Sequence, residues 1–205
     1  MSIVKLSNNG VKNATSFGSV SSGAMTFIKK LTASSSATLS FVDGSSSVVL
    51  DNTYKEYLFT FNNMHPASDA VNFVFNGSID SGSNYNVTKT TTFFNAYHFE
   101  NDSSTALTYN ASQDLAQSTD FQILEDSVGN DNDQSCVGYL HLFNPSSTTF
   151  VKHFISSNHR AFSGDASSEN HVAGYFNTTS AIDAVQFKMS SGNIDAGDIC
   201  LYGIN

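Results

Sequence analysis

The chain has 205 residues, a formal net charge of −9, and charged side chains at only 13% of its positions. Ordinary globular domains carry about 25%, so Ser, Thr and Asn must supply most of the polar surface. Arg160 is the single arginine, and Lys29-Lys30 is the single pair of adjacent basic residues. Phosphate backbones are bound through several Lys and Arg contacts. We therefore expect no nucleic-acid partner and no acidic lipid partner.

The distribution of apolar residues argues against a secreted protein and against a membrane-spanning protein. The N-terminal sequence lacks the apolar core of a secretory signal, and no run approaches the roughly 18 apolar residues that span a bilayer. We expect neither secretion nor membrane insertion. Cys136 and Cys200 both fall in expected strands, and we interpret them as free thiols that behave as small hydrophobic residues. Whether they lie within disulfide range is not established by the sequence.

The first segment, residues 1–23, is polar and rich in Gly and Ser, with one apolar group at Ile3, Val4 and Leu6. We interpret it as an extended N-terminal arm. It is either a disordered terminus or an attachment peptide that becomes ordered on a partner. In the second case the three apolar residues are the attachment contact. The remaining residues, 24–205, form one globular domain.

Within that domain, apolar and polar residues alternate with a period of two, which predicts β-strands. The clearest strands cover residues 24–32, 37–42, 54–64, 70–75, 87–100, 136–143, 150–155, 171–176, 181–189 and 198–204. Residues 120–128 fit a strand or a short helix, and we favour the strand because its neighbours are strands. Residues 101–117 fit no clear period, and residues 157–170 are expected to form a long polar loop. Ten or eleven short strands predict an all-β, antiparallel sandwich or barrel.

The most distinctive element is a β-hairpin between Cys136 and Ser156, which we expect near the centre of a sheet. On its first strand Tyr139 and His141 share one face. The turn is predicted at residues 144–147, Asn-Pro-Ser-Ser, because Pro fixes φ and Asn bonds its own backbone. His141 and His153 are candidate cross-strand neighbours.

No spacing of residues indicates a catalytic or metal site. The nucleophile elbow G-x-S-x-G is absent, as are H-E-x-x-H and C-x-x-C. His98, His141, His153 and His171 are therefore interpreted as structural or surface residues. We expect no enzymatic activity and no cofactor.

Acidic residues and tyrosines offer weaker candidate sites. Asp131 and Asp133 resemble half of a calcium loop, but the pattern lacks its central Gly and its closing Glu. We interpret them as a solvated loop tip. The acid pairs 100/102 and 125/126 are sequence neighbours, whereas a glycosidase places its two acids on separate elements, so these pairs too are expected to be solvated. Exposed tyrosines can stack on sugar rings, and the candidates for glycan contact are Tyr85, Tyr109 and Tyr175.

Four stretches of the chain carry a resemblance to a known family: residues 53–98, 114–135, 140–156 and 178–204. The last stretch, residues 178–204, is the most distinctive of the four. It holds a Gly-Asn-Ile-x-x-Gly turn at residues 192–197 and a short strand that ends in Leu-Tyr-Gly at residues 201–203. In these residues the chain resembles small virion and tail-fibre-type structural proteins of tailed phages of marine bacteria, of cyanophage or pelagiphage type.

The resemblance implies a jelly-roll-like sandwich, often trimeric, carried on the virion after assembly in the cytoplasm of the bacterial host. It implies a non-enzymatic structural protein, as a tail fibre or a capsid appendage, and transfers no catalytic residues. The expected partners are other phage structural proteins, two further copies in a homotrimer, and a host-surface glycan. A carbohydrate-binding module used in host recognition and a capsid decoration protein are the alternatives.

Overall fold

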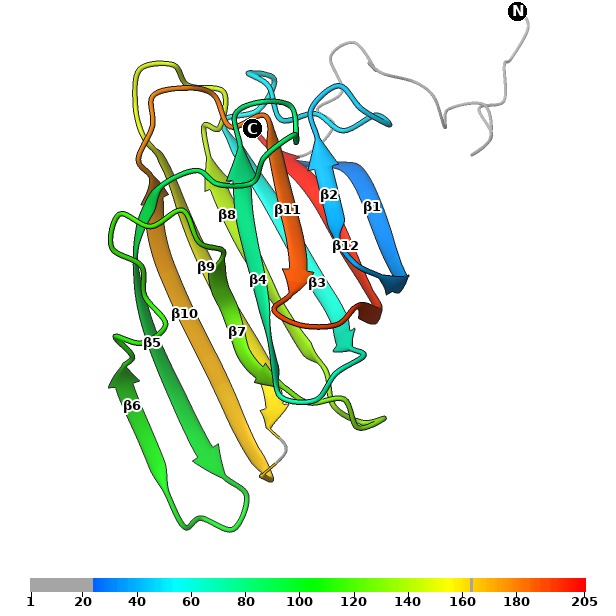
Figure 1. The fold of residues 1–205 in the computed structure, drawn as a ribbon, viewed down its shortest axis with the longest axis vertical. Helices are drawn as coiled ribbons and strands as arrows, with labels where there is room; N and C mark the ends of the chain where they lie inside the picture. The colour runs from blue at the N-terminus through cyan, green and yellow to red at the C-terminus, as the bar shows by residue number, and fades with distance from the viewer. Residues whose placement is uncertain (1–23, 163) are drawn as a thin grey trace, which may run out of the picture.

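The computed structural model describes residues 24–162 and 164–205, and the regular structure in them consists of β-strands in two antiparallel sheets (Figure 1). The larger sheet has, in order across it, β1 (Met25–Ser36), β12 (Ile194–Ile204), β3 (Glu56–Pro66), β8 (Cys136–Phe143), β9 (Lys152–Phe162), β10 (Ala166–Phe176), β5 (Lys89–Phe99) and β6 (Thr105–Tyr109). The smaller sheet has the order β2 (Leu39–Val42), β11 (Ala184–Met189), β4 (Val71–Ser78) and β7 (Gln122–Val128).

This arrangement confirms the predicted all-β sandwich for the described residues. The predicted arm, with Ile3, Val4 and Leu6, lies outside them. In the part of the chain that the structure describes, no helix is long and apolar enough to cross a membrane.

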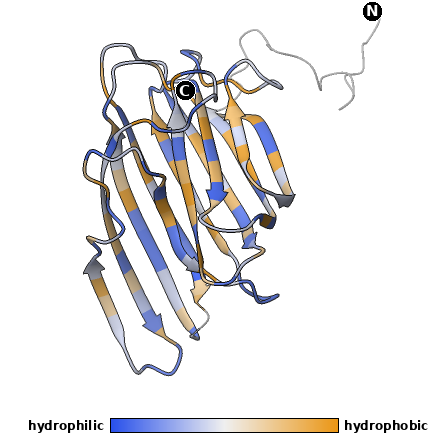
Figure 2. Ribbon diagram, viewed as in Figure 1, coloured by the Kyte–Doolittle hydropathy of each residue, from blue (hydrophilic) through white to orange (hydrophobic). Residues whose placement is uncertain are grey.

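The core between the sheets is built mainly from phenylalanine rings. Phe187 of β11 lies at its centre, with five other ring centroids between 5.2 and 6.2 Å away: Phe41, Phe59, Phe61, Phe73 and Phe75. All six side chains are buried. These rings recur at every second position of their strands, as Phe59 and Phe61 do in β3, and hydrophobic and hydrophilic residues alternate along much of both sheets (Figure 2). A few large aromatic residues thus bury much apolar surface.

The predicted central hairpin is confirmed as β8 and β9, the fourth and fifth of the eight strands in the larger sheet. Its turn lies where expected, and the Ser147 backbone N–H donates to the Asn144 carbonyl at 3.0 Å. The expected pairing of His141 with His153 is wrong. His141 pairs with Ile155, and His153 lies two residues before Ile155 on the same face of β9.

The long polar loop predicted at residues 157–170 is also wrong. β9 continues to Phe162 and β10 begins at Ala166, so that most of this segment forms a second long hairpin. Its inward-facing side chains include Asn158, Arg160 and Asn170, and such a composition resembles a loop. They are nevertheless buried, because polar groups of the smaller sheet face them.

The two uncertain segments are also resolved. Within 120–128 the chain forms the strand β7, as favoured, and within 101–117 it forms the short edge strand β6.

The larger sheet extends beyond the smaller one. In Figure 1 the lower ends of β5, β6 and β10 continue past the end of β7, so the inner face of the larger sheet is left open there. The residues at these ends are Tyr97 and Phe99 of β5, Phe162 of β9, and Ala166 and Ser168 of β10.

Candidate functional site

One candidate site is the outer face of the larger sheet, the side turned away from the smaller sheet. It carries five of the six histidines, one or two from each of four neighbouring strands: His98, His141, His153, His159 and His171. Four of them alternate with buried residues of their strands, as Leu140 and Leu142 flank His141, whereas His98 lies between the half-buried Tyr97 and Phe99. The interpretation of the histidines as surface or structural residues fits their exposed and half-buried positions.

The histidines lie among aromatic and aliphatic side chains. The ring of His171 stacks on Phe94 across the β10–β5 pair, with centroids 5.0 Å apart and an angle of 18°. His141 meets the edge of Tyr139 at 5.3 Å, and Ile155 beside it is 51% exposed. We call this group the outer patch, and its members are Phe94, Val137, Tyr139, His141, His153, Ile155, His171 and Tyr175.

Two carboxylates at the outer patch each contact a histidine. Glu56 contacts His141, and Glu169 Oε1 lies 3.2 Å from His171 Nε2. Most other acidic residues lie in loops, so the patch carries little of the net charge of −9. Exposed apolar patches of this kind mark interaction surfaces.

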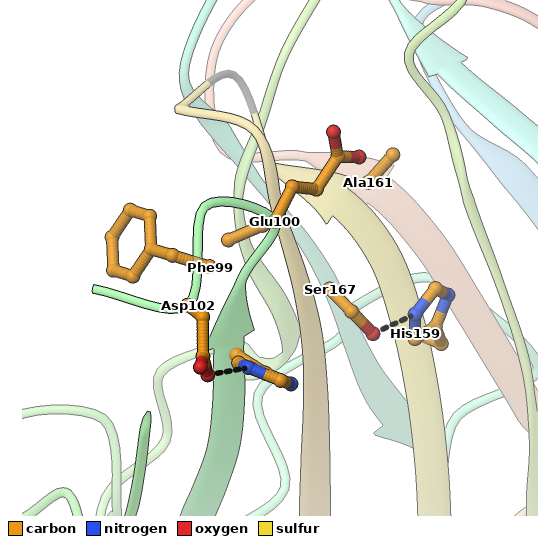
Figure 3. Close-up of a pocket in the computed structure, with 8 residues that line it drawn as sticks. Phe99, Glu100, Asp102, His159, Ala161 and Ser167 are labelled. Atoms are coloured by element: carbon orange, nitrogen blue, oxygen red, sulfur yellow. Dashed lines mark hydrogen bonds and ion pairs between the residues drawn. The ribbon is translucent and has the colours of Figure 1, made fainter. Parts of the chain in front are cut away.

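A hollow of about 370 Å³ lies at the end of the outer face, beside the loop after β5 (Figure 3). Its polar groups form two separate pairs: Ser167 Oγ is 2.9 Å from His159 Nε2, and Asp102 Oδ1 is 3.0 Å from His98 Nε2. A nucleophilic triad needs the acid and the serine on the same histidine. Here they contact different histidines, so this arrangement supplies no relay from Asp102 to Ser167.

A second candidate lies on the inner face, where β7 crosses β9 and β10. Arg160 Nη1 donates to Glu125 Oε1 at 2.6 Å and also contacts Asp126. Asn170 Nδ2 donates to the same Glu125 oxygen at 2.7 Å and to Asp126 Oδ1 at 2.9 Å. Glu125 is fully buried, so the expectation of a solvated acid pair at 125/126 is wrong. Burial raises the pKa of Glu125 to about 8, against the opposing attraction of Arg160.

Beside this cluster is a groove of about 230 Å³ at the open end of the inner face. Arg160 and Ser168 are its buried polar members, at 5% and 3% exposure. In the described part of the chain, Arg160 Nε has no hydrogen-bond partner. The complete lining is Asn95, Tyr97, Phe99, Arg160, Phe162, Ala166 and Ser168. The sequence pattern did not single out this group, although Tyr97 and Phe99 recur with the spacing of a strand face.

The three tyrosines proposed for glycan contact lie on different elements. Tyr175 belongs to the outer patch, and Tyr109 lies on edge strand β6, where its hydroxyl contacts Asp114. Tyr85 lies in the loop before β5, and its carbonyl accepts from Asn76 Nδ2 at 2.8 Å. Tyr109 pairs with Phe94 of the outer patch, so it and Tyr175 share the outer face of the larger sheet, whereas Tyr85 lies apart in its loop.

The structure also locates the predicted loop tip at residues 131–133 and the two cysteines. Asp131 and Asp133 are exposed in the turn between β7 and β8, and residues 24–162 and 164–205 contain no group of three or more His, Cys, Asp or Glu that could hold a metal ion. Cys136 and Cys200 are both free. They lie on β8 and β12, which β3 separates, and burial raises the pKa of the Cys136 thiol.

No protein-family model, no curated protein and no solved structure matches this chain.

Proposed function

We propose that the protein is a non-enzymatic structural component of a phage virion, and that its copies associate as a homotrimer through the outer patch. The observation that carries the proposal is the patch itself. It presents apolar and aromatic side chains on the broad face of a sheet, with Tyr139 and Ile155 41% and 51% exposed. The resemblance to phage fibre proteins supports the setting on a particle.

The strand order supports the jelly-roll-like topology that the resemblance implies. When the hairpins β5–β6 and β9–β10 are set aside, the remaining orders are β1-β12-β3-β8 and β2-β11-β4-β7. The chain passes between these two four-stranded halves at nearly every step, as in an eight-stranded, two-sheet jelly roll. The two extra hairpins pair through β10 and β5 and widen one of the sheets.

The charge distribution favours copies of the same chain as the partner on the outer patch. Two chains of charge −9 repel each other most where acids dominate. At the patch the carboxylates are Glu56 and Glu169, whereas most other acids lie in loops, so few like charges face one another when two copies meet there. Buried aromatic residues commonly dominate the energetics of such interfaces.

The proposal is tested by light scattering on the full chain at about 10 µM, a concentration at which a stable assembly with a nanomolar Kd remains associated. We expect a trimer, and we expect Ile155→Asp to dissociate it by placing a charge in the patch. Phe150→Asp is the matched control, because Phe150 is 70% exposed but lies in the turn before β9. A monomeric parent protein, or equal effects of both substitutions, would contradict the proposal.

The virion setting has its own test. The chain should be found by mass spectrometry in purified particles of the phage that encodes it, in a fixed ratio to the capsid protein. Its absence from particles, with presence in the infected-cell lysate, would rule out the structural role.

A further inference from the structure

We propose that the groove at the open end of the inner face, between β5, β9 and β10, binds a single neutral sugar residue of a glycan. This inference is independent of the proposed trimer, because the groove and the outer patch lie on opposite faces of the larger sheet.

The apolar part of the groove suits the face of a sugar ring. Tyr97 and Phe99 lie edge to face on β5, with centroids 5.7 Å apart and an angle of 84°. Phe162 closes the other side from β9, where the guanidinium of Arg160 lies 5.1 Å from its ring centre. All three aromatic side chains are half-buried, so part of each remains accessible. Rings held in this way offer a rigid apolar surface against which C–H groups can pack.

The polar part of the groove is made by two side chains on neighbouring strands. Arg160 is 5% exposed and lines the groove, and its Nη1 is held by Glu125 and Asp126. Ser168, also buried, lies on the neighbouring strand β10 and lines the same space. A sugar hydroxyl both donates and accepts, so one hydroxyl can serve the guanidinium and the serine together.

The charge and size of the groove restrict the ligand further. The positive charge of Arg160 is already matched by Glu125 and Asp126, and the chain as a whole is strongly negative. An anionic ligand would therefore gain little from this arginine. The volume of about 230 Å³ is below the roughly 300–1,000 Å³ of pockets for drug-sized ligands. It is suited to one ring of a neutral sugar, with the rest of the glycan outside.

The groove owes its openness to the two extra hairpins. β5, β9 and β10 extend past β7 (Figure 1), and the aromatic residues lie on the part of the inner face that the smaller sheet does not cover. Elsewhere on this face the corresponding positions, such as Phe93 and Phe154, are fully buried. The same alternation that builds the core therefore places aromatic residues at an accessible site.

The test is a titration of the full, isotope-labelled chain with the methyl glycosides of glucose, galactose, mannose and N-acetylglucosamine, and with glucuronic acid as the charged comparison. We expect at least one neutral glycoside to shift the backbone amides of Tyr97, Phe99 and Ser168, with a Kd of the order of 1 mM, as befits a single ring. These shifts in the parent protein test the site even if a variant fails to fold.

Variants then locate the contact. Tyr97→Ala should weaken binding at least tenfold, whereas Tyr139→Ala, which removes an exposed tyrosine of the outer patch, should leave it unchanged. The proposal is overturned by any of three results: no shifts in the groove with any neutral glycoside at about 50 mM, equal loss in both variants, or tighter binding of glucuronic acid.

Discussion

Arg160 and Glu125 form a fully buried ion pair that joins the two sheets, with Nη1 of β9 donating to Oε1 of β7 at 2.6 Å. Asn170 of β10 donates to the same oxygen. Phenylalanine rings fill the centre of the interface between the sheets, whereas this end is held by charge-assisted hydrogen bonds. Such pairs gain little net stability over a well-packed apolar substitute, but removal of one partner leaves an uncompensated buried charge.

The first prediction concerns this pair. At pH 9, above the pKa of about 8 at which Glu125 ionises, Arg160→Met should destabilise the protein by about 3–5 kcal/mol, because Glu125 loses its charged partner inside the sandwich. The double variant Arg160→Met/Glu125→Leu should recover much of that loss, since it removes both charges. Urea unfolding followed by circular dichroism measures both differences. A loss below about 1 kcal/mol in the single variant, as for an exposed pair, would show that the pair is not buried in solution.

The second prediction follows from the raised pKa of Glu125. Its folded-state pKa of about 8 lies above the value of about 4.3 expected in the unfolded chain. Between these values the folded protein holds a proton that the unfolded chain has released, so this group's contribution to stability falls as the pH rises from about 4.3 to about 8. Glu125→Gln, which imitates the protonated acid, should remove that part of the pH dependence.

The measurement is the free energy of unfolding of parent and variant at several pH values from 5 to 9. We expect the parent to lose stability relative to Glu125→Gln as the pH rises through this range. Glu100→Gln, at an exposed position beyond β5, serves as the control and should follow the parent. Parallel profiles for all three proteins would show that Glu125 keeps an ordinary carboxyl pKa in the folded state.

How far the sequence predicts this molecule depends on what its strands bury. Where the inward positions are apolar, as Leu140 and Leu142 are in β8, the period of two located the strand and its central place. Where the inward positions are polar, as Asn158 and Arg160 are, the residues still alternate with a period of two, but their composition predicts a loop. A hydrophobic pattern cannot reveal burial that depends on polar partners from another strand.

The candidate sites were less predictable than the fold. Tyr97 and Phe99 have the spacing of core residues, and their exposure depends on where the smaller sheet ends, which the local sequence does not encode. The outer patch depends in the same way on register across four strands: His171 meets Phe94 because β10 pairs with β5, two strands that are far apart in the sequence. The Leu-Tyr-Gly ending has a local reason that only the structure shows, since the ring of Tyr54 lies directly over Gly203.

The third prediction concerns the centre of the core. Phe187 contacts rings from both sheets, at 5.3 Å from Phe59 and 5.9 Å from Phe73, so its removal leaves a cavity that neither sheet can fill without moving. Phe187→Ala should therefore cost about 3–5 kcal/mol, and Phe187→Leu clearly less. Phe150→Ala, at an exposed ring in the turn before β9, should stay within about 0.5 kcal/mol of the parent. Urea unfolding with an unchanged m-value measures these effects. If Phe187→Ala and Phe150→Ala proved equally mild, the two sheets would not pack through this ring, and the sandwich would need a different core.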